Sequence, residues 1–511
     1  DRLKGVSLEL EAGKIFALVG ESGSGKSVTS MAAMRLLPDA LEITDGAVHV
    51  GEQDLFSLSE SRMQAVRGRR VAMIFQNAMT ALNPVQTVGQ QVAETLKLHT
   101  ILRGDALRQR VVQLFDEVGI PDPAQRFTFY PHQLSGGQQQ RVMIAMALAC
   151  EPEVLIADEP TTALDVTLQE QVLELIRELT QSRKLAVLLI THDMGVVRNT
   201  ADEVAVMYRG EIIERADVET FFHNPKQEYS RRLIDALPDL THFQSAAVEE
   251  ALLQLDDVKV HFPIRKGVLQ RVVDVTRAVD GVSLKIGRGE TYALVGESGS
   301  GKSTLGRAIL NLESVAGGTV SFNGQPIQQL GRKEMLPYRK QIQVIFQNPY
   351  SSMNPRLSVG EIIAEGMVSL GLGLSEEQRQ SKISALLTRV QLGPEFAGRY
   401  PHEFSGGQLQ RIAIARALAV EPELIICDEP TSALDVSIRS EVLDLLRELQ
   451  QEFGVSYLFI THDLSIIPSL AHHVGVMQYG KIVEQGNAEQ ILTRPGHPYT
   501  QALLKSVPRI D

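Results

Sequence analysis

Two copies of one glycine-rich segment carry the clearest chemistry in the sequence. In each copy, glycines let backbone N–H groups turn inward around phosphate oxygens, and a lysine can reach the outer phosphates of a nucleotide. The hydroxyl of the serine after the lysine can coordinate Mg²⁺. The pattern therefore predicts two sites that hold a nucleotide by its phosphates. The residues are Gly20, Glu21, Ser22, Gly23, Ser24, Gly25, Lys26 and Ser27 in the first copy, and Gly296, Glu297, Ser298, Gly299, Ser300, Gly301, Lys302, Ser303 and the following Thr304 in the second.

Two acidic pairs could complete these sites. Asp158 and Glu159 follow a short apolar run, and Asp428 and Glu429 follow a similar run in the second half of the chain. Because neighbouring side chains on a strand face opposite ways, each aspartate can serve the Mg²⁺ shell while the glutamate beside it polarises an attacking water. The alternative is that these acids only face solvent at strand ends. The phosphate-binding segments favour the metal and water roles.

The sequence contains one internal repeat. The repeated motifs mark the segments of each half that must position the predicted site residues. The order of the repeated motifs is the same in both halves, and this indicates a tandem duplication. The motifs are LVGESGSGKS from Leu18 and Leu294, FQNAMTALNP from Phe75 and FQNPYSSMNP from Phe346, YPHQLSGGQ from Tyr130 and YPHEFSGGQ from Tyr400, ADEPTTALDV from Ala157 and CDEPTSALDV from Cys427, and ITHD from Ile190 and Ile460.

Each half alternates β-rich runs with helical stretches, which predicts an α/β fold with a mostly parallel sheet covered by helices. Strands are expected at 15–19 and 292–295, directly before the glycine-rich turns. Segments 78–134 and 349–404 are richer in helix formers and are interpreted as helical subdomains. We expect a first domain at 1–240, a linker at 241–250 and a second domain at 251–511.

Composition limits the classes of protein that fit. The chain has 511 residues and a formal net charge of −12, which permits two or more globular cores and argues against broad binding of nucleic acid. Cys150 and Cys427 are the only cysteines, too few for a disulfide framework or a four-cysteine metal site, so a reducing compartment is expected. The apolar runs are shorter than the about 20 residues of a membrane helix. A role at a membrane would therefore depend on partner proteins.

Another repeated motif indicates a family. The segments Leu134 to Gln138 and Phe404 to Gln408 resemble the signature motif of ABC ATPases, which bind ATP with Mg²⁺. The resemblance covers nearly the whole chain and implies two tandem ABC ATPase domains, each a P-loop NTPase (RecA-like) core with an antiparallel β subdomain and an inserted α-helical subdomain. It also implies head-to-tail pairing, in which the signature of one half completes the ATP site of the other. The signature residues are Ser135, Gly136, Gly137 and Gln138, and Ser405, Gly406, Gly407 and Gln408.

The same resemblance implies roles for further residues. A glutamine senses Mg²⁺ and the attacking water. A switch histidine contacts the γ-phosphate and steadies Glu159 or Glu429, and an aspartate crosses the interface between the paired domains. The alternatives are an ordinary loop amide, a structural histidine and a helix N-cap. Both halves hold every expected residue type, which predicts two competent ATPase sites. The matching residues are Gln76 and Gln347, His192 and His462, and Asp165 and Asp435.

Several details resemble the branch of ABC ATPases that serves oligopeptide, dipeptide and nickel importers. The fused arrangement and the stretch Phe262 to Asp274 resemble single-chain ATPases of oligopeptide and microcin C importers, with those of glutathione importers as close rivals. This branch implies two transmembrane permease subunits and a periplasmic substrate-binding protein as partners, no nucleic acid, and a peripheral place on the cytoplasmic side of the inner membrane. The other details are Asn83-Pro84, Asn354-Pro355, His497 to Thr500, and a weaker copy at Asn224-Pro225 with Tyr229.

The sequence departs from this branch at two points. Its two cysteines cannot supply the cysteine-rich extension for an iron–sulfur cluster that the branch often carries. When the glycine-rich segments are aligned, Asp1 falls opposite Arg277. The first half is therefore expected to lack its N-terminal strand and the aromatic residue that stacks on adenine. Phe262 is a candidate for that aromatic in the second half.

Tandem ABC ATPases also occur in other functional classes. A ribosome-associated translation factor would carry a long charged helical linker, whereas only residues 241–250 are available here. DNA-repair and chromosome-organising ABC ATPases carry zinc modules or long coiled coils, and neither pattern is present in the sequence. A nucleotide-dependent regulator fits the motifs but leaves the importer-like segments unexplained. We therefore expect an importer ATPase.

Overall fold

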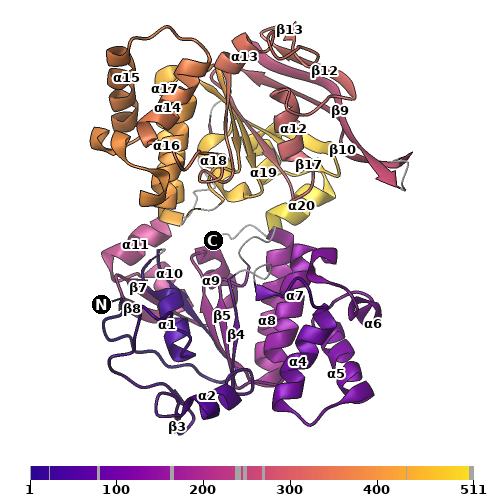
Figure 1. The fold of residues 1–511 in the computed structure, drawn as a ribbon, viewed down its shortest axis with the longest axis vertical. Coiled ribbons are helices and arrows are strands. Elements are labelled where there is room, and N and C mark those ends of the chain that lie inside the picture. The colour runs from indigo at the N-terminus through magenta and orange to yellow at the C-terminus, as the bar shows by residue number, and fades with distance from the viewer. Residues whose placement is uncertain are drawn as a thin grey trace. The chain divides into compact units, whose positions relative to one another are not determined.

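The computed structural model describes residues 2–21, 23–76, 81–161, 166–235, 243–244, 250–266, 271–432, 434 and 436–505. The chain divides into two compact units, one extending to Leu237 and the other beginning at Pro238 (Figure 1). Each unit is described by itself below. The domain limits 1–240 and 251–511 stay predictions, because most of the predicted linker lies outside the described residues.

A six-stranded sheet forms the centre of the first unit, in the order β4-β5-β6-β1-β7-β8. The first five of these strands run parallel, and β8 pairs with β7 in the antiparallel direction. Every residue of β1 and β6 is buried, as expected for parallel strands covered on both faces. The strands are β1 Ile15–Val19, β4 Val71–Ile74, β5 Val154–Asp158, β6 Ala186–Ile190, β7 Glu203–Tyr208 and β8 Glu211–Asp217.

The second unit repeats this sheet with the same order and directions, as β14-β15-β16-β11-β17-β18. The strand predicted at 15–19 is β1, and the strand predicted at 292–295 is β11, which begins one residue earlier. The predicted α/β class with a mostly parallel sheet is therefore confirmed. The strands are β11 Thr291–Val295, β14 Ile342–Ile345, β15 Leu424–Asp428, β16 Ser456–Thr461, β17 His473–Gln478 and β18 Lys481–Asn487.

Antiparallel strands accompany each parallel sheet. In the second unit they form a four-stranded sheet in the order β10-β9-β12-β13. In the first unit, the part that the structure describes holds a two-stranded pair, β2 with β3. The predicted antiparallel subdomain is thus extensive in the second unit and short in the first. The strands are β2 His49–Val50, β3 Gln53–Asp54, β9 Ala251–Lys266, β10 Arg271–Gly287, β12 Gly317–Phe322 and β13 Gln325–Pro326.

A group of helices lies on the side of each unit away from its antiparallel strands (Figure 1). These helices lie in and just after the segments predicted as helical, 78–134 and 349–404. In the first unit they are α4 Val88–His99, α5 Gly104–Glu117, α6 Pro123–Arg126, η1 Pro131–Gln133 and α7 Gly136–Leu148. In the second they are α14 Val359–Ser369, α15 Glu376–Arg389, η2 Pro394–Gly398, η3 Pro401–Glu403 and α16 Gly406–Leu418.

The remaining helices belong to the sheet-containing cores and the segments after them. For example, α1 contacts β5, α9 contacts β1, and α12 contacts β15. No helix in the described ranges is long and apolar enough to cross a membrane. These helices are α1 Lys26–Ala33, α2 Glu60–Val66, α8 Val166–Arg183, α9 Met194–Thr200, α10 Val218–His223, α11 Glu228–Asp235, α12 Lys302–Ile309, α13 Leu336–Gln341, α17 Val436–Phe453, η4 Leu464–Ile466, α18 Ile467–Leu470, α19 Ala488–Thr493 and α20 Pro498–Lys505.

Local sequence explains why the helical group forms. On α5, the buried residues Leu107, Val111, Leu114 and Phe115 recur three or four positions apart, so they share one face of the helix. Thr87 caps α4 through a hydrogen bond from the N–H group of the third helical residue, whose side chain bonds back to the cap. Helix α5 therefore packs through one apolar face, whereas α7 is buried on most of its sides.

We expect Phe115→Ala to destabilise the first unit. Phe115 is fully buried in the core that joins the helical group to the sheet, and truncation there leaves a cavity that lowers the free energy of unfolding by about 3–5 kcal/mol. Ile101→Ala is the control, because Ile101 is 96% exposed and its loss changes stability by about 0.5 kcal/mol or less. Denaturant unfolding followed by circular dichroism measures both, and equal midpoints would contradict the packing.

Candidate nucleotide-binding and catalytic site

Each glycine-rich loop curls around the ammonium group of its own lysine. The loop of the first unit runs from the end of β1 to the start of α1, and Lys26 Nζ donates to the carbonyl oxygens of Gly20 and Glu21 at 2.7 and 2.9 Å. Lys302 Nζ makes the equivalent bonds to Gly296 and Glu297 at 2.7 and 2.8 Å. Both lysines are buried. The ammonium groups are thereby fixed inside the loops, and Ser22 lies outside the described residues.

Glycine is required at the first position of each loop. Gly20 has φ of 149°, and a Cβ there would lie 2.2 Å from the backbone oxygen of Met207. Gly296 has φ of 151°, and a Cβ would lie 2.1 Å from the backbone oxygen of Met477. Such distances are far below van der Waals contact, and the conformation favours glycine. Each loop therefore packs against the neighbouring strand of its sheet, which is β7 in the first unit and β17 in the second.

The serine after each lysine is paired with the aspartate at the end of a neighbouring strand. Ser27 Oγ donates to Asp158 at 3.2 Å, and Ser303 Oγ donates to Asp428 at 2.7 Å. Burial raises the pKa of both aspartates above the ordinary value, although the serine hydrogen bond opposes this shift. A hydroxyl and a carboxylate that converge in this way are oxygen ligands of the kind that Mg²⁺ takes.

The glutamate after each aspartate is held by two side chains from different loops. Glu159 accepts a hydrogen bond from Gln76 Nε2 at 2.7 Å, and its other oxygen lies 3.1 Å from His192 Nδ1. Its backbone N–H donates to the carbonyl of Ile190, and its φ is 46°. This left-handed conformation is uncommon outside glycine and often marks functional positions. Three separated sequence motifs therefore meet at one carboxylate.

The second unit builds the same arrangement around Glu429. Gln347 Nε2 donates to Glu429 at 2.8 Å, and His462 Nδ1 lies 3.3 Å from its other oxygen. Burial opposes ionisation of Glu429, but the hydrogen bond and charge of His462, the charge of Lys302 and the Gln347 amide together hold its pKa below the ordinary value. Glu429 therefore stays ionised, which its predicted role of polarising water requires.

The signature residues open a helix in each unit. Ser135 caps α7 by accepting from the N–H of Gln138, whose side chain returns a hydrogen bond to the Ser135 N–H. Ser405 and Gln408 cap α16 in the same way. Ser135, Gly136, Ser405 and Gly406 are exposed, whereas Gly137 and Gly407 are buried. Each helix start therefore presents a hydroxyl and N–H groups to its surroundings.

Close packing explains the second glycine of each signature. A Cβ at Gly137 would lie 2.9 Å from Leu168 on α8, and a Cβ at Gly407 would lie 2.6 Å from Ile438 on α17. The other predicted interface residues, Asp165 and Asp435, lie outside the described residues. Gly137 and Gly407 therefore allow each signature helix to pack closely against the next long helix. The role of the two aspartates stays a prediction.

Two tyrosines for which the sequence predicts no site role contact the loops. The hydroxyl of Tyr229 accepts a hydrogen bond from the N–H of Glu21 at 3.1 Å, and Tyr499 accepts one from the N–H of Glu297 at 3.0 Å. Their equivalent positions in the two halves of the sequence were the signal that could have indicated a shared role. Phe262, the candidate adenine contact, is 38% exposed on β9.

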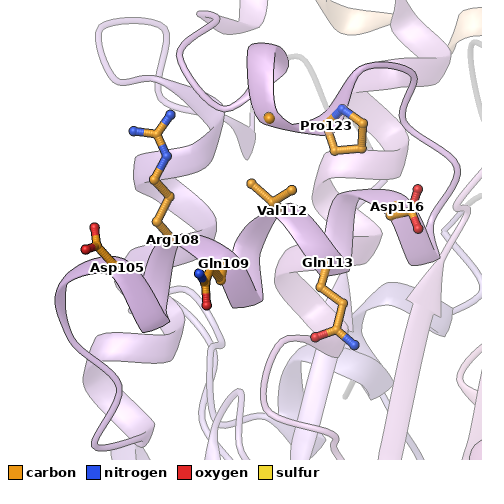
Figure 2. Close-up of a pocket in the computed structure, with 8 residues that line it drawn as sticks. Asp105, Arg108, Gln109, Val112, Gln113, Asp116 and Pro123 are labelled. Carbon is orange, nitrogen blue, oxygen red and sulfur yellow. The ribbon is translucent and has the colours of Figure 1, made fainter.

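A surface pocket of about 600 Å³ lies elsewhere, on α5 and α6 (Figure 2). Asp105, Arg108 and Asp116 from α5 and Pro123 from α6 are among its lining residues. None of the predicted nucleotide-site residues lines it. The pocket is therefore separate from the chemistry of the phosphate loop.

Comparison with known proteins identifies the family. The sequence model described as ABC transporter matches residues 3–162 and 279–432, more than half of the chain. This chain belongs to the ABC transporter family of ATP-binding proteins. A second model, described as the C-terminal region of oligopeptide and dipeptide transporters, matches residues 213–255 and 483–511. Both matches occur twice in the chain, which confirms the tandem ABC domains.

Similar curated proteins are transport ATPases. The peptidoglycan transport ATP-binding protein YejF of Agrobacterium fabrum is 48% identical, over 99% of this chain and 93% of the relative. The glutathione import ATP-binding protein GsiA of Salmonella choleraesuis is 46% identical, over 100% of this chain and 87% of the relative. An uncharacterised ABC transporter ATP-binding protein, YejF of Escherichia coli K12, is 47% identical, over 98% of this chain and 94% of the relative. These relatives give no support to the translation-factor alternative, and the expected importer ATPase class is confirmed.

We expect Gly20→Ala and Gly296→Ala to weaken nucleotide binding by this ABC ATPase. Strain of about 1–3 kcal/mol at the forbidden conformation corresponds to an increase of about 5-fold to 150-fold in the dissociation constant for ADP at the altered site. Isothermal titration calorimetry measures it. Gly398→Ala is the control, since a Cβ there meets open space. Unchanged ADP affinity in both loop variants would contradict the assignment of these loops as the binding site.

Proposed function

We propose that this chain is the ATP-binding and ATP-hydrolysing subunit of an ABC importer for oligopeptides or peptide-like compounds in the bacterial inner membrane. The observation that carries the proposal is present in both units: a lysine held inside a phosphate loop, a serine–aspartate pair, and a glutamate bonded to a glutamine and a histidine. Membership of the ABC transporter family and the match to the C-terminal region of peptide transporters support the transport role.

The residues present fit Mg²⁺ and ATP. Ser27 with Asp158, and Ser303 with Asp428, offer the hydroxyl and carboxylate oxygens that a magnesium ion accepts. The oxygen of Ser24 is buried and has no hydrogen-bond partner among the described residues. This group is available to a phosphate oxygen that enters the loop. We therefore assign Ser27, Asp158 and Gln76, and Ser303, Asp428 and Gln347, to the two Mg²⁺ sites.

The chain's own groups divide the work of hydrolysis. When bound, Mg²⁺ and ATP supply the phosphoryl group that is transferred to water and the cation that balances its charge. Lys26 holds the outer phosphates, and the loop N–H groups align them. A carboxylate oxygen of Glu159 accepts a proton from the attacking water. His192 and Gln76 orient that carboxylate, and the second unit works with the equivalent residues.

We further propose that the two ABC domains pair head to tail within one chain. The exposed serine and N–H groups at the starts of α7 and α16 suit a γ-phosphate bound by the other domain. Nucleotide binding would then draw the domains together, and hydrolysis would release them. Asp165 and Asp435 would lie at the interface of this pair. ATP-dependent closure would provide the mechanical step of transport.

The proposed partners are two transmembrane permease subunits and a periplasmic substrate-binding protein. The chain would attach to the permeases at the cytoplasmic face of the inner membrane, through surfaces beside Gln76 and Gln347. These glutamines contact the catalytic glutamates, so they are placed to link permease movement to hydrolysis. The net charge of −12 argues against nucleic acid as a partner.

The cargo is best assigned as a peptide-like class. The relatives named for peptidoglycan transport and glutathione import have similar identities to this chain, and their named cargoes both contain short peptides. Microcin C-like compounds belong to this peptide-like class, and nickel is an alternative within the same branch. ATPases of this type contact the permease rather than the cargo, so the binding protein decides between these compounds.

We expect Glu159→Gln and Glu429→Gln each to remove most ATP turnover, and the double variant to lower it by about 10²- to 10⁴-fold, because the amide cannot accept a proton from water. A coupled phosphate-release assay measures turnover. Glu174→Gln is the matched control, since Glu174 lies exposed on α8. If each single variant kept most of its activity, the hypothesis of two equally required sites would be wrong.

We expect the full chain, purified from gently solubilised native membranes, to carry two multi-span permeases and a binding protein whose eluted ligand is a peptide. Mass spectrometry of the proteins and of the small molecules tests both the importer and the cargo class. The double glutamate variant with added ATP should retain more permease if closure strengthens the complex. Ribosomal proteins or nucleic acid in place of permeases would overturn the transport assignment.

A further inference from the structure

The segment after the last strand of each parallel sheet reaches back to the phosphate loop. In the first unit this segment runs from β8 through α10 to α11, and Tyr229 near the start of α11 accepts the 3.1 Å hydrogen bond from the N–H of Glu21. In the second unit it runs from β18 through α19 to α20, where Tyr499 accepts the 3.0 Å bond from Glu297. The same connection is therefore built twice.

A carboxylate on the last strand fixes the chain just before each tyrosine. The buried Glu214 on β8 accepts hydrogen bonds from the backbone N–H groups of Lys226 and Gln227 at 2.7 and 3.0 Å. In the second unit, Glu484 on β18 accepts equivalent bonds from two backbone N–H groups at 2.6 and 3.1 Å. Hydrogen bonds between a carboxylate and N–H groups are among the stronger ones in proteins. The position of each tyrosine is therefore set by the sheet and not only by its helix.

The hairpin that begins this segment also contacts the phosphate loop. The backbone N–H of Gly210, in the turn between β7 and β8, donates to the carbonyl of Ser24 at 2.8 Å. Gly480, in the turn between β17 and β18, donates to Ser300 at 2.9 Å. Each loop is thus held at two points, by the hairpin near its end and by the tyrosine near its start.

The hydrogen bond from the loop to each tyrosine hydroxyl is the same in the two halves, although the packing around the tyrosine rings differs. The ring of Tyr229 packs against Tyr208, with centroids 4.4 Å apart. The position equivalent to Tyr208 in the second half is Gln478, yet the hydroxyl of Tyr499 still accepts the bond from the loop. The ring environment differs between the halves while the hydrogen bond is the same. The hydroxyl contact is therefore the shared feature.

We propose that Tyr229 and Tyr499 are positioning residues that hold the phosphate loops in their binding conformation, and so make nucleotide affinity depend on the C-terminal segment of each domain. This inference rests on the proposed function only in taking these loops as the nucleotide site. Both tyrosines lie within the regions matched by the model of the peptide-transporter C-terminal region. A loop that is already ordered loses less conformational entropy when its N–H groups bind phosphate. The tyrosines act on the nucleotide through the loop backbone.

Hydrogen exchange without nucleotide tests the contact directly. Tyr229→Phe keeps the ring and removes the acceptor for the Glu21 N–H, so amide exchange in peptides covering residues 15–27 should rise by about two- to tenfold. Peptides covering 291–303 should not change. Tyr499→Phe should give the reverse pattern. The flanking residues of the two loops differ, so mass spectrometry distinguishes the peptides, and each loop serves as the internal reference for the other.

Binding and kinetics then distinguish positioning from general stability. Each variant should raise the dissociation constant for ADP at its own site by about two- to tenfold, and raise the KM for ATP with a smaller change in kcat. Tyr338→Phe on α13 is the control, because its ring packs against Phe322 and lies away from the phosphate loops. Thermal unfolding checks that all three variants are folded.

Two results would overturn the inference. The first is unchanged loop exchange in folded Tyr229→Phe and Tyr499→Phe proteins. The second is faster exchange with unchanged ADP affinity, which would make the contact structural only. If Tyr499→Phe did not fold, Glu484→Gln would give a second exchange test of the same loop, because it weakens the hydrogen bonds that hold the chain just before Tyr499. A wild-type chain that failed to bind ADP would instead contradict the proposed function, while leaving the exchange result readable.

Discussion

The structure depends on a buried ammonium group at the end of the central strand of each parallel sheet. A buried lysine is stable only when polar groups surround it, and here the carbonyls of the loop itself supply them, as Lys26 shows with Gly20 and Glu21. A loop can fold back on its own lysine only if its backbone adopts conformations that favour glycine. In the first unit, Gly20, Gly23 and Gly25 allow this backbone path, with φ values of 149°, 79° and 114°.

The order of the strands brings the remaining predicted catalytic groups to the same edge. β1 lies beside β6, and β6 lies beside β5, all in the parallel direction. Their carboxyl ends therefore meet at one edge of the sheet, where ligands bind in open α/β folds. The phosphate loop follows β1, Glu159 follows β5, and His192 follows β6. Gln76 follows β4, the next strand outward, and completes the set around the glutamate.

Sequence reasoning predicted the features that are local and repeated, and missed those that depend on distant contacts. The strands before the loops, the helical segments and the ABC family were all predictable, because periodicity and motif spacing encode them. The bond between Tyr229 and Glu21 joins residues far apart in the chain, and no local pattern specifies it. The family resemblance implied that His192 steadies Glu159, and their 3.1 Å contact fits this expectation. The resemblance also named Gln76, but no pattern predicted its bond to Glu159.

The duplication shows which interactions tolerate change. The loop lysine and serine, the Asp–Glu pair, and the glutamine and histidine near the glutamate are the same residue types in both units, but their neighbours differ. Ser30 donates a further hydrogen bond to Asp158 at 3.4 Å, whereas the equivalent residue in the second unit is Gly306, where a Cβ would lie 3.1 Å from Ile460. Asp428 therefore has one hydrogen-bond donor fewer than Asp158, but the nearby charge of Arg307 lowers its pKa, and the residue equivalent to Arg307 in the first unit is Met31. The two sites hold the same types of groups, but their carboxylates have different electrostatic support, so the halves are chemically similar rather than identical.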